Sequence, residues 1–93
     1  MIRSFRHKGL RELFLTGQTA RLPHAHQKKI KMVLTVLDAA YEIKDFRLPS
    51  FRLHRLQAPP LEGYFSIDIS ANYRLVFRFE SHDVFDLDYL DTH

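Results

Sequence analysis

The hydrophobic period changes once along this chain, and that change constrains the fold more than any other feature. As far as Leu48-Pro49 the apolar residues recur every three to four positions, and beyond it they recur every second position. The first spacing is typical of amphipathic helices, and the second of strands with one buried face. Helices followed by strands predict an α+β domain in which two N-terminal helices pack on a twisted antiparallel β-sheet.

Two helices are expected in the first half of the chain. The first lies within residues 7–17, where Gly17 supplies a stop. Its apolar positions are Leu10, Leu13 and Phe14. The second follows Pro23, a residue suited to a first helical turn. Its apolar stripe comprises Ile30, Val33, Leu34, Leu37 and Tyr41. Leu48-Pro49 should end the helical region, because proline disfavours helical geometry in the preceding residue.

Short strands separated by turn signals are expected in the rest of the chain, with one more at the N-terminus. The expected strands are residues 1–6, 51–56, 65–70, 73–79 and 82–90. The last three should form an antiparallel meander with one buried face, since their apolar and polar residues alternate and short turns separate them.

The last strand leads directly into the end of the sequence, YLDTH. Its alternation places three apolar residues on the buried face and Asp86 and Asp88 on the other. The three apolar residues are Phe85, Leu87 and Tyr89. If the pleat continues, Asp91 and His93 share the face of Tyr89.

Length and composition predict one compact domain over residues 1–93, because 45% of the residues are hydrophobic and no linker is visible. The absence of cysteine excludes a disulfide scaffold and a thiolate metal site. No apolar run approaches the roughly 18 residues needed to cross a bilayer, and no secretory leader is visible. We therefore expect a soluble, cytoplasmic protein without a membrane partner.

Basic residues gather in the first part of the chain, although the net charge is only +3. Lys28, Lys29 and Lys31 lie together on the second expected helix and could follow RNA phosphates. The alternative is an ordinary solvated helix face. Tyr64 and Tyr73, near strand ends, are the candidates for stacking on bases.

Histidines and arginines that interrupt the strand pattern suggest phosphodiester chemistry. His54 stands in one expected strand, Arg74 and Arg78 in another, and His93 ends the chain beside Asp91. Histidine transfers protons near neutral pH, and arginine offers a planar fork to phosphate oxygens. RNA brings its own nucleophile, the 2′-hydroxyl, so an enzyme needs only these groups to cleave it. The alternative is that the arginines pair with Asp86 or Asp88 across the sheet.

A metal nuclease is a weaker alternative. His24 and His26 together with Asp86, Asp88 and Asp91 include enough potential ligands for a metal ion. However, side chains two positions apart at a helix start diverge, and the aspartates fit the solvated side of an edge strand. No metal and no other cofactor is therefore expected.

Five stretches, taken in their order and spacing, resemble the HigB-type toxins of the RelE superfamily over nearly the whole chain. The stretches are MIRSFRHKGLRELF, LDAA, FRLHRL, GYFSIDISANYRLVFRFE and DVFDLDYLDTH. The resemblance implies a compact α+β toxin that enters the ribosomal A site and cuts mRNA there without metal, using the 2′-hydroxyl. It also implies a partner, a HigA-like helix-turn-helix antitoxin that holds the toxin inactive and represses the operon.

The resemblance also assigns the site residue by residue. The family's H-x-L-K-G histidine falls on His54, and its N-W-R-I arginine falls on Arg74. Its terminal D-Y-H falls on Asp91, Thr92 and His93. Proton transfer would then belong to His54 and His93, the phosphate contact to Arg74, and the orientation of His93 or a substrate contact to Asp91.

Two departures from the family pattern bear on activity. Gln57 stands where the family has lysine, and Thr92 where it has tyrosine, so a fixed positive charge and a stacking ring are both missing. Arg52, Arg55 and Lys44 are the candidates to supply that charge, and Arg55, Gln57 and Thr92 are expected to contact RNA. The losses keep a second hypothesis open: a toxin fold that binds ribosome and antitoxin without cutting, acting in growth or operon regulation.

Overall fold

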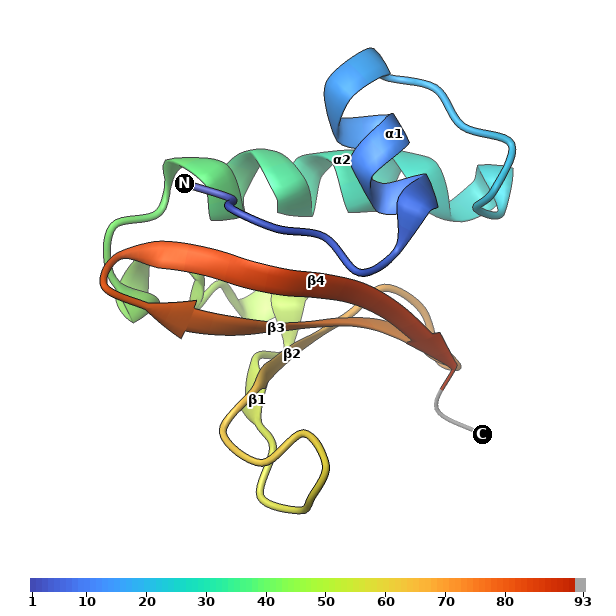
Figure 1. The fold of residues 1–93 in the computed structure, drawn as a ribbon. Helices are drawn as coiled ribbons and strands as arrows, with labels where there is room; N and C mark the ends of the chain where they lie inside the picture. The colour runs from blue at the N-terminus through green and yellow to red at the C-terminus, as the bar shows by residue number, and fades with distance from the viewer. Residues whose placement is uncertain (92–93) are drawn as a thin grey trace.

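A computed structural model describes residues 1–91, in which two helices cover one face of a four-stranded antiparallel sheet (Figure 1). The helices are α1 (Lys8–Thr16) and α2 (His24–Ala39), and the short 3₁₀ helices η1 (Ile43–Phe46) and η2 (Pro49–Phe51) follow them. The sheet order is β1-β2-β3-β4, comprising β1 (His54–Arg55), β2 (Phe65–Asp68), β3 (Tyr73–Glu80) and β4 (Asp83–Asp91). The expected α+β fold is confirmed.

Local sequence explains where both helices begin and end. The His7 side chain caps α1 by accepting a hydrogen bond from the Gly9 N–H at 3.0 Å. Gly17 ends α1 with a φ of 82°, a left-handed conformation that glycine adopts without a steric cost. Pro23 immediately precedes α2 rather than lying within it, and Ala40 turns extended after its last residue.

One residue of the expected α2 stripe is misplaced. Tyr41 lies beyond the end of the helix and is 61% exposed. The stripe therefore stops at Leu37, because Ala40 leaves the helical conformation before another turn is complete. Neither α1 nor α2, within the part of the chain that the structure describes, is long and apolar enough to cross a membrane.

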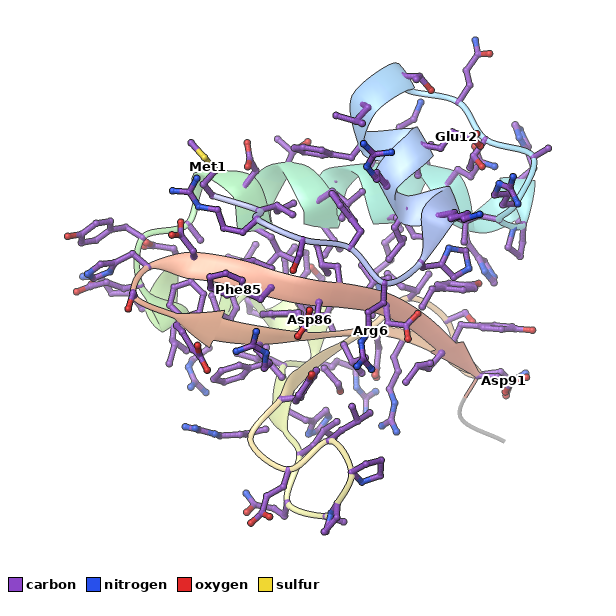
Figure 2. The ribbon with its side chains drawn as sticks, viewed as in Figure 1. Met1, Arg6, Glu12, Phe85, Asp86 and Asp91 are labelled. Carbon is purple, nitrogen blue, oxygen red and sulfur yellow. The ribbon has the colours of Figure 1, made fainter. Side chains whose placement is uncertain are left out.

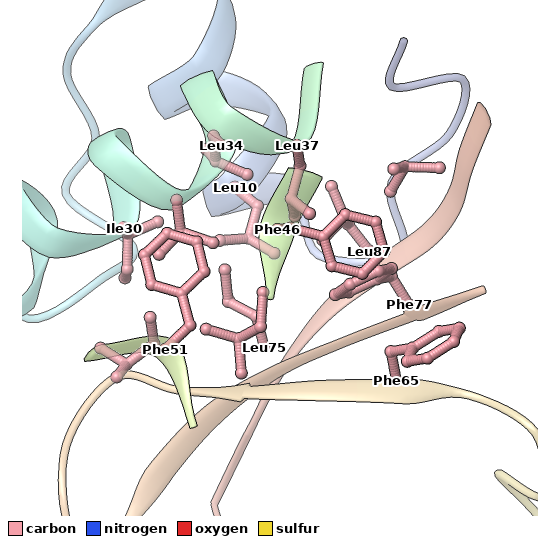
Figure 3. Close-up of a cluster of buried hydrophobic side chains, with 14 of the residues drawn as sticks. Leu10, Ile30, Leu34, Leu37, Phe46, Phe51, Phe65, Leu75, Phe77 and Leu87 are labelled. Carbon is pink, nitrogen blue, oxygen red and sulfur yellow. The ribbon is translucent and has the colours of Figure 1, made fainter. Parts of the chain in front are cut away.

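The core lies between the helices and the inner face of the sheet, and aromatic side chains fill much of it (Figure 3). The Phe46 ring from η1 packs edge-on against Phe65 and Phe77 at centroid distances of 5.8 and 5.4 Å. The core residues that the figure labels on the helices and the sheet are Leu10, Ile30, Leu34, Leu37, Phe65, Leu75, Phe77 and Leu87. This packing fixes which sheet face is covered by helices, and we call the opposite one the outer face.

Two of the short expected strands are mostly absent. Residues 1–6 make only isolated parallel bridges with β4, from Ile2 to Val84 and from Phe5 to Leu87. The expected strand at 51–56 shrinks to β1, because Phe51 belongs to η2 and Arg52 takes a left-handed conformation with φ 49°. The loop between β1 and β2 then projects away from the helices (Figure 1).

A bulge in β4 overturns part of the expected alternation. Between the pairs Val76–Asp88 and Arg78–Phe85, β3 contributes one residue and β4 contributes two. The extra residue is accommodated at Asp86, whose φ is 58°. Val84 and Leu87 are therefore both buried, whereas Phe85 turns outward beneath the Arg78 guanidinium, 5.0 Å from the ring centroid. The prediction that Phe85 faces the core was wrong.

Candidate active site

The outer face of the sheet brings His54 and Arg74 onto one surface. Strand register aligns His54, Ser66, Val76 and Asp88 in one cross-strand row, and Asp68, Arg74 and Leu90 in the next. Directly paired residues share a face, so both rows lie opposite the inner-face core. His54 and Arg74 are two strands apart, a lateral separation of about 10 Å. They also stand in adjacent rows, two residues apart along the strands, so the register places them on one face at different positions along it.

Arg74 has the features of a phosphate-binding side chain. Its Nε is buried and has no hydrogen-bond partner among residues 1–91. The acid directly opposite, Asp68, forms its ion pair with Arg52 instead, with Nε and Oδ2 3.3 Å apart. Within the described residues, then, no acidic side chain neutralises the Arg74 guanidinium, and an uncompensated guanidinium is suited to an anionic ligand.

Arg78, on the same strand and face as Arg74, is held in ion pairs within the protein. It forms ion pairs with Asp86 and Glu80, each at 2.8 Å. These two acids raise the pKa of Arg78, and Arg78 in turn holds the pKa of Asp86 below its ordinary value of 3.8. The pairing across the sheet that the sequence left open is thus realised at Arg78 with Asp86, and not at Arg74.

The three candidates for the missing positive charge lie in different places. Arg52 reaches the Arg74 row through Asp68. Arg55 is directly opposite Phe65 and holds its guanidinium over that ring at 5.2 Å, on the other side of β1 from His54. Lys44 pairs with Glu42 at 3.3 Å on η1. Arg52 is therefore the one whose ion pair reaches the residue opposite Arg74. Gln57 lies exposed just beyond β1.

The last described residue of β4 lies on the inner face of the sheet. Asp91 is the last residue of β4 (Figure 2). It pairs in register with Tyr73, and Tyr89 pairs with Leu75. The expected shared parity of Asp91 and Tyr89 is confirmed. By register, however, Asp91 occupies the face opposite to that of His54 and Arg74. Thr92 and His93 lie outside the described residues.

An aromatic cluster that the sequence did not reveal supports this end of β4. The Tyr89 hydroxyl lies 2.6 Å from His26 Nδ1, and the Tyr89 ring stacks on Tyr73 with centroids 5.0 Å apart. Burial raises the pKa of Tyr89 to about 12, helped by Tyr73 and Asp91. The alternation of the strands indicated that Tyr73 and Tyr89 share the inward face, but no sequence pattern indicated that His26 would contact them.

The three lysines lie apart from the outer face, because α2 packs on the inner one. Lys29 Nζ donates to the Ser50 carbonyl at 3.4 Å. Lys31 lines a groove of about 260 Å³ between α1 and α2, together with Leu13 and Phe14. Lys28 is exposed on the same helix. If these lysines contact RNA, it is a different stretch of RNA from the one facing His54.

The residues that suggested a metal site are dispersed. His26 binds Tyr89, and Asp86 is paired with Arg78 and Ser4. Among residues 1–91, no group of three histidine or acidic side chains is placed to hold a metal ion.

Comparison with known proteins finds similarity along nearly the whole chain. The family model of the RelE-like toxin of the type II toxin-antitoxin system HigB matches residues 3–93. The chain is 40% identical to endoribonuclease HigB of Proteus vulgaris over 93 residues, which is all of both chains. It is also 30% identical to an uncharacterized protein of Haemophilus influenzae over 90 residues, covering 96% of this chain and 88% of that one. The chain belongs to the HigB-like toxins, the RelE-like toxins of type II toxin-antitoxin systems.

Proposed function

We propose that this protein is an endoribonuclease toxin that cleaves mRNA in the ribosomal A site without a metal ion. One observation carries the proposal: Arg74 shares the outer face with His54, and no acid among the described residues neutralises it. The full-length similarity to a protein named endoribonuclease HigB supports the same reaction class. Ribosomal cleavage also implies a cytoplasmic site of action.

The chemistry follows from what RNA supplies. The 2′-oxygen attacks the adjacent phosphorus, the bond from phosphorus to the 5′-oxygen breaks, and the products are a 2′,3′-cyclic phosphate and a 5′-hydroxyl. Arg74 would hold the non-bridging oxygens as negative charge builds on them. His54 and His93 would exchange protons with the attacking and leaving oxygens. Asp91 lies on the inner face, so it would have to orient His93 or contact the substrate from the exposed end of β4.

The two faces of the molecule would have different RNA partners. The outer face would take the message, whereas Lys28, Lys29 and Lys31 on α2 would contact ribosomal RNA phosphates. Such contacts are independent of sequence and weaken steeply with salt. The remaining partner is a HigA-like helix-turn-helix antitoxin, which family membership implies and which would block the toxin until it is removed.

The decisive experiment maps 5′ ends of a message on programmed ribosomes after purified protein is added. His54→Ala, Arg74→Ala and a chain ending at Leu90 should each lose codon-phased cuts while keeping wild-type circular dichroism. Arg11→Ala and His24→Ala are matched controls, because both side chains are exposed and far from the outer face. Cuts that persist in Arg74→Ala would refute the proposed phosphate contact.

A second candidate is a toxin fold that binds ribosome and antitoxin without cutting. It is favoured by Gln57, which is exposed at the end of β1 where the family carries a lysine. Intact message at every codon, together with undiminished ribosome binding, would establish it. In that case Gln57→Lys combined with Thr92→Tyr should create cleavage.

A further inference from the structure

Two buried side-chain polar atoms in residues 1–91 have no hydrogen-bond partner, and both belong to residues of the outer face. They are Ser66 Oγ and Arg74 Nε. Ser66 is fully buried. Buried polar atoms in native proteins are nearly always paired, so two unpaired ones on neighbouring rows of the same sheet face call for an explanation.

Strand register places Ser66 between the two candidate site residues. Ser66 is the direct cross-strand partner of His54, and such partners have Cβ atoms about 5 Å apart. On its other side it pairs with Val76, two residues from Arg74, so Ser66 and Arg74 are diagonal neighbours about 7–8 Å apart. A serine hydroxyl lies within reach of a histidine ring at the first distance, and an arginine side chain spans the second.

The hydrogen-bonding capacities of the three groups are complementary. The Arg74 guanidinium only donates, a neutral histidine ring has one nitrogen that accepts, and a serine hydroxyl donates one hydrogen bond while accepting others. Neither bond is present in the described structure, where both atoms are unpaired, but Ser66 can accept from Arg74 Nε and donate to His54 when those two side chains turn toward it. Because Ser66 is fully buried, it has no surface with which to touch RNA.

We propose that Ser66 is a positioning residue that links Arg74 to His54 once a phosphate binds above them, a link that the described structure does not contain. The link directs the remaining N–H groups of Arg74 at the phosphate. It also occupies the accepting nitrogen of neutral His54, so that this ring presents its N–H to a phosphate or leaving-group oxygen and not a base to the 2′-hydroxyl. This inference rests on the proposed RNA cleavage and refines it, since the base would then be His93.

Two readouts on Ser66→Ala test the proposal, and only one of them depends on cleavage. The first is single-turnover cleavage on programmed ribosomes. We expect the maximal rate constant to fall roughly ten- to a hundredfold while the half-saturating protein concentration stays unchanged, because misdirected groups slow the chemical step without weakening binding. The second is ¹⁵N NMR of the His54 ring in protein saturated with inorganic phosphate, where the single tautomer of wild type should give way to a mixture in Ser66→Ala. Ser50→Ala, at an exposed serine outside the sheet, should leave both unchanged.

The outcomes separate this inference from the proposed function. Unchanged His54 ring signals in Ser66→Ala would overturn the link, whatever happens to the rate. If Ser66→Ala changes the His54 ring signals but the wild-type protein never cuts RNA, the link is upheld and the proposed nuclease activity is rejected. Ser66→Thr, which keeps the hydroxyl, should restore the single tautomer. If Ser66→Ala does not fold, Ser66→Cys, with a weaker donor of similar size, must show the tautomer mixture or the proposal fails.

Discussion

Substitution of Asp86 should reveal how much of the stability of β4 depends on one bulge residue. Asp86 has a φ of 58°, and its carboxylate accepts hydrogen bonds from Arg78 Nε at 2.8 Å and from Ser4 Oγ at 3.3 Å. Its own N–H donates to Ser4 Oγ at 2.8 Å. The residue therefore combines a left-handed backbone with a charge-assisted contact, and different substitutions remove different parts of this combination.

The expected losses of unfolding free energy follow from those parts. A hydrogen bond to a charged group contributes about 1.5–3 kcal/mol, and the low end applies because the Asp86 side chain is 28% exposed. Asp86→Asn keeps an acceptor and tolerates positive φ, so it should lose about 1 kcal/mol. Asp86→Gly loses the contacts but fits the backbone, at about 1.5 kcal/mol. Asp86→Ala loses the contacts and adds about 1 kcal/mol of left-handed strain, for a total of about 2.5 kcal/mol.

Urea unfolding at pH 7, followed by circular dichroism, measures this series. Asp88→Ala is the matched control, because Asp88 lies on the same strand outside the bulge, and its change should stay within about 0.5 kcal/mol. An alanine variant as stable as the glycine variant would refute the strain argument. Losses within 0.5 kcal/mol for all three Asp86 variants would refute the contribution of the carboxylate as well.

The same carboxylate predicts a pH dependence with a definite sign. Arg78 holds the pKa of folded Asp86 below 3.8, so the unfolded chain takes up this proton first as the pH falls. Stability from Asp86 is therefore fully present above about pH 4 and is lost as the pH drops through the folded pKa. The advantage of wild type over Asp86→Asn should shrink in that acidic range, and an unchanged advantage would contradict the assignment.

Three further predictions concern the chain end and the outer face. Tyr89→Phe removes the hydrogen bond to His26 and should lower the free energy of unfolding by about 1 kcal/mol. The pKa of folded Tyr89 is about 12 against an ordinary 10.0, so the wild-type protein should lose stability as the pH rises from 10 to 12. Thermal melts of the variant should not show that Tyr89-dependent loss. Arg74→Lys should cleave at least about tenfold more slowly than wild type in the ribosome assay, since lysine lacks the planar fork, and equal rates would count against a forked phosphate contact. Arg52→Ala should slow cleavage by about tenfold, because it frees Asp68 to pair with Arg74. Adding Asp68→Asn should restore the rate. A double variant that stays slow would mean that Arg52 itself contacts the substrate.

Hydrophobic periodicity correctly predicted the helices and strands that bury one continuous apolar face. Both helices and the three long strands lie where their apolar spacing placed them, because each buries one continuous face on a single core. Phe65 contributes to the core, and Tyr73 to the aromatic cluster beside it. The fold class therefore followed from sequence without information about distant contacts.

The errors arose where distant residues decide a local conformation. The left-handed turn at Asp86 is held by Arg78 across the β3–β4 hairpin and by Ser4 from the distant N-terminal segment. No local pattern signals these contacts, so Phe85 was assigned to the core. Ser66 was missed for a related reason, since a serine between two buried residues of an alternating strand is typical of a solvated face, yet here it is fully buried.

The contrast between Arg74 and Arg78 shows why a site can be suspected from sequence but not assigned from it. The two side chains lie on one strand and one face, four positions apart, each with acids within reach. Arg78 is neutralised because the bulge turns Asp86 toward it, whereas Asp68, the natural partner of Arg74, is taken by Arg52. Whether an arginine pairs within the sheet or stays free to bind a phosphate thus depends on which of the neighbouring basic side chains pairs with each nearby acid. That competition is settled only by the folded arrangement, and in this chain it leaves Arg74 available.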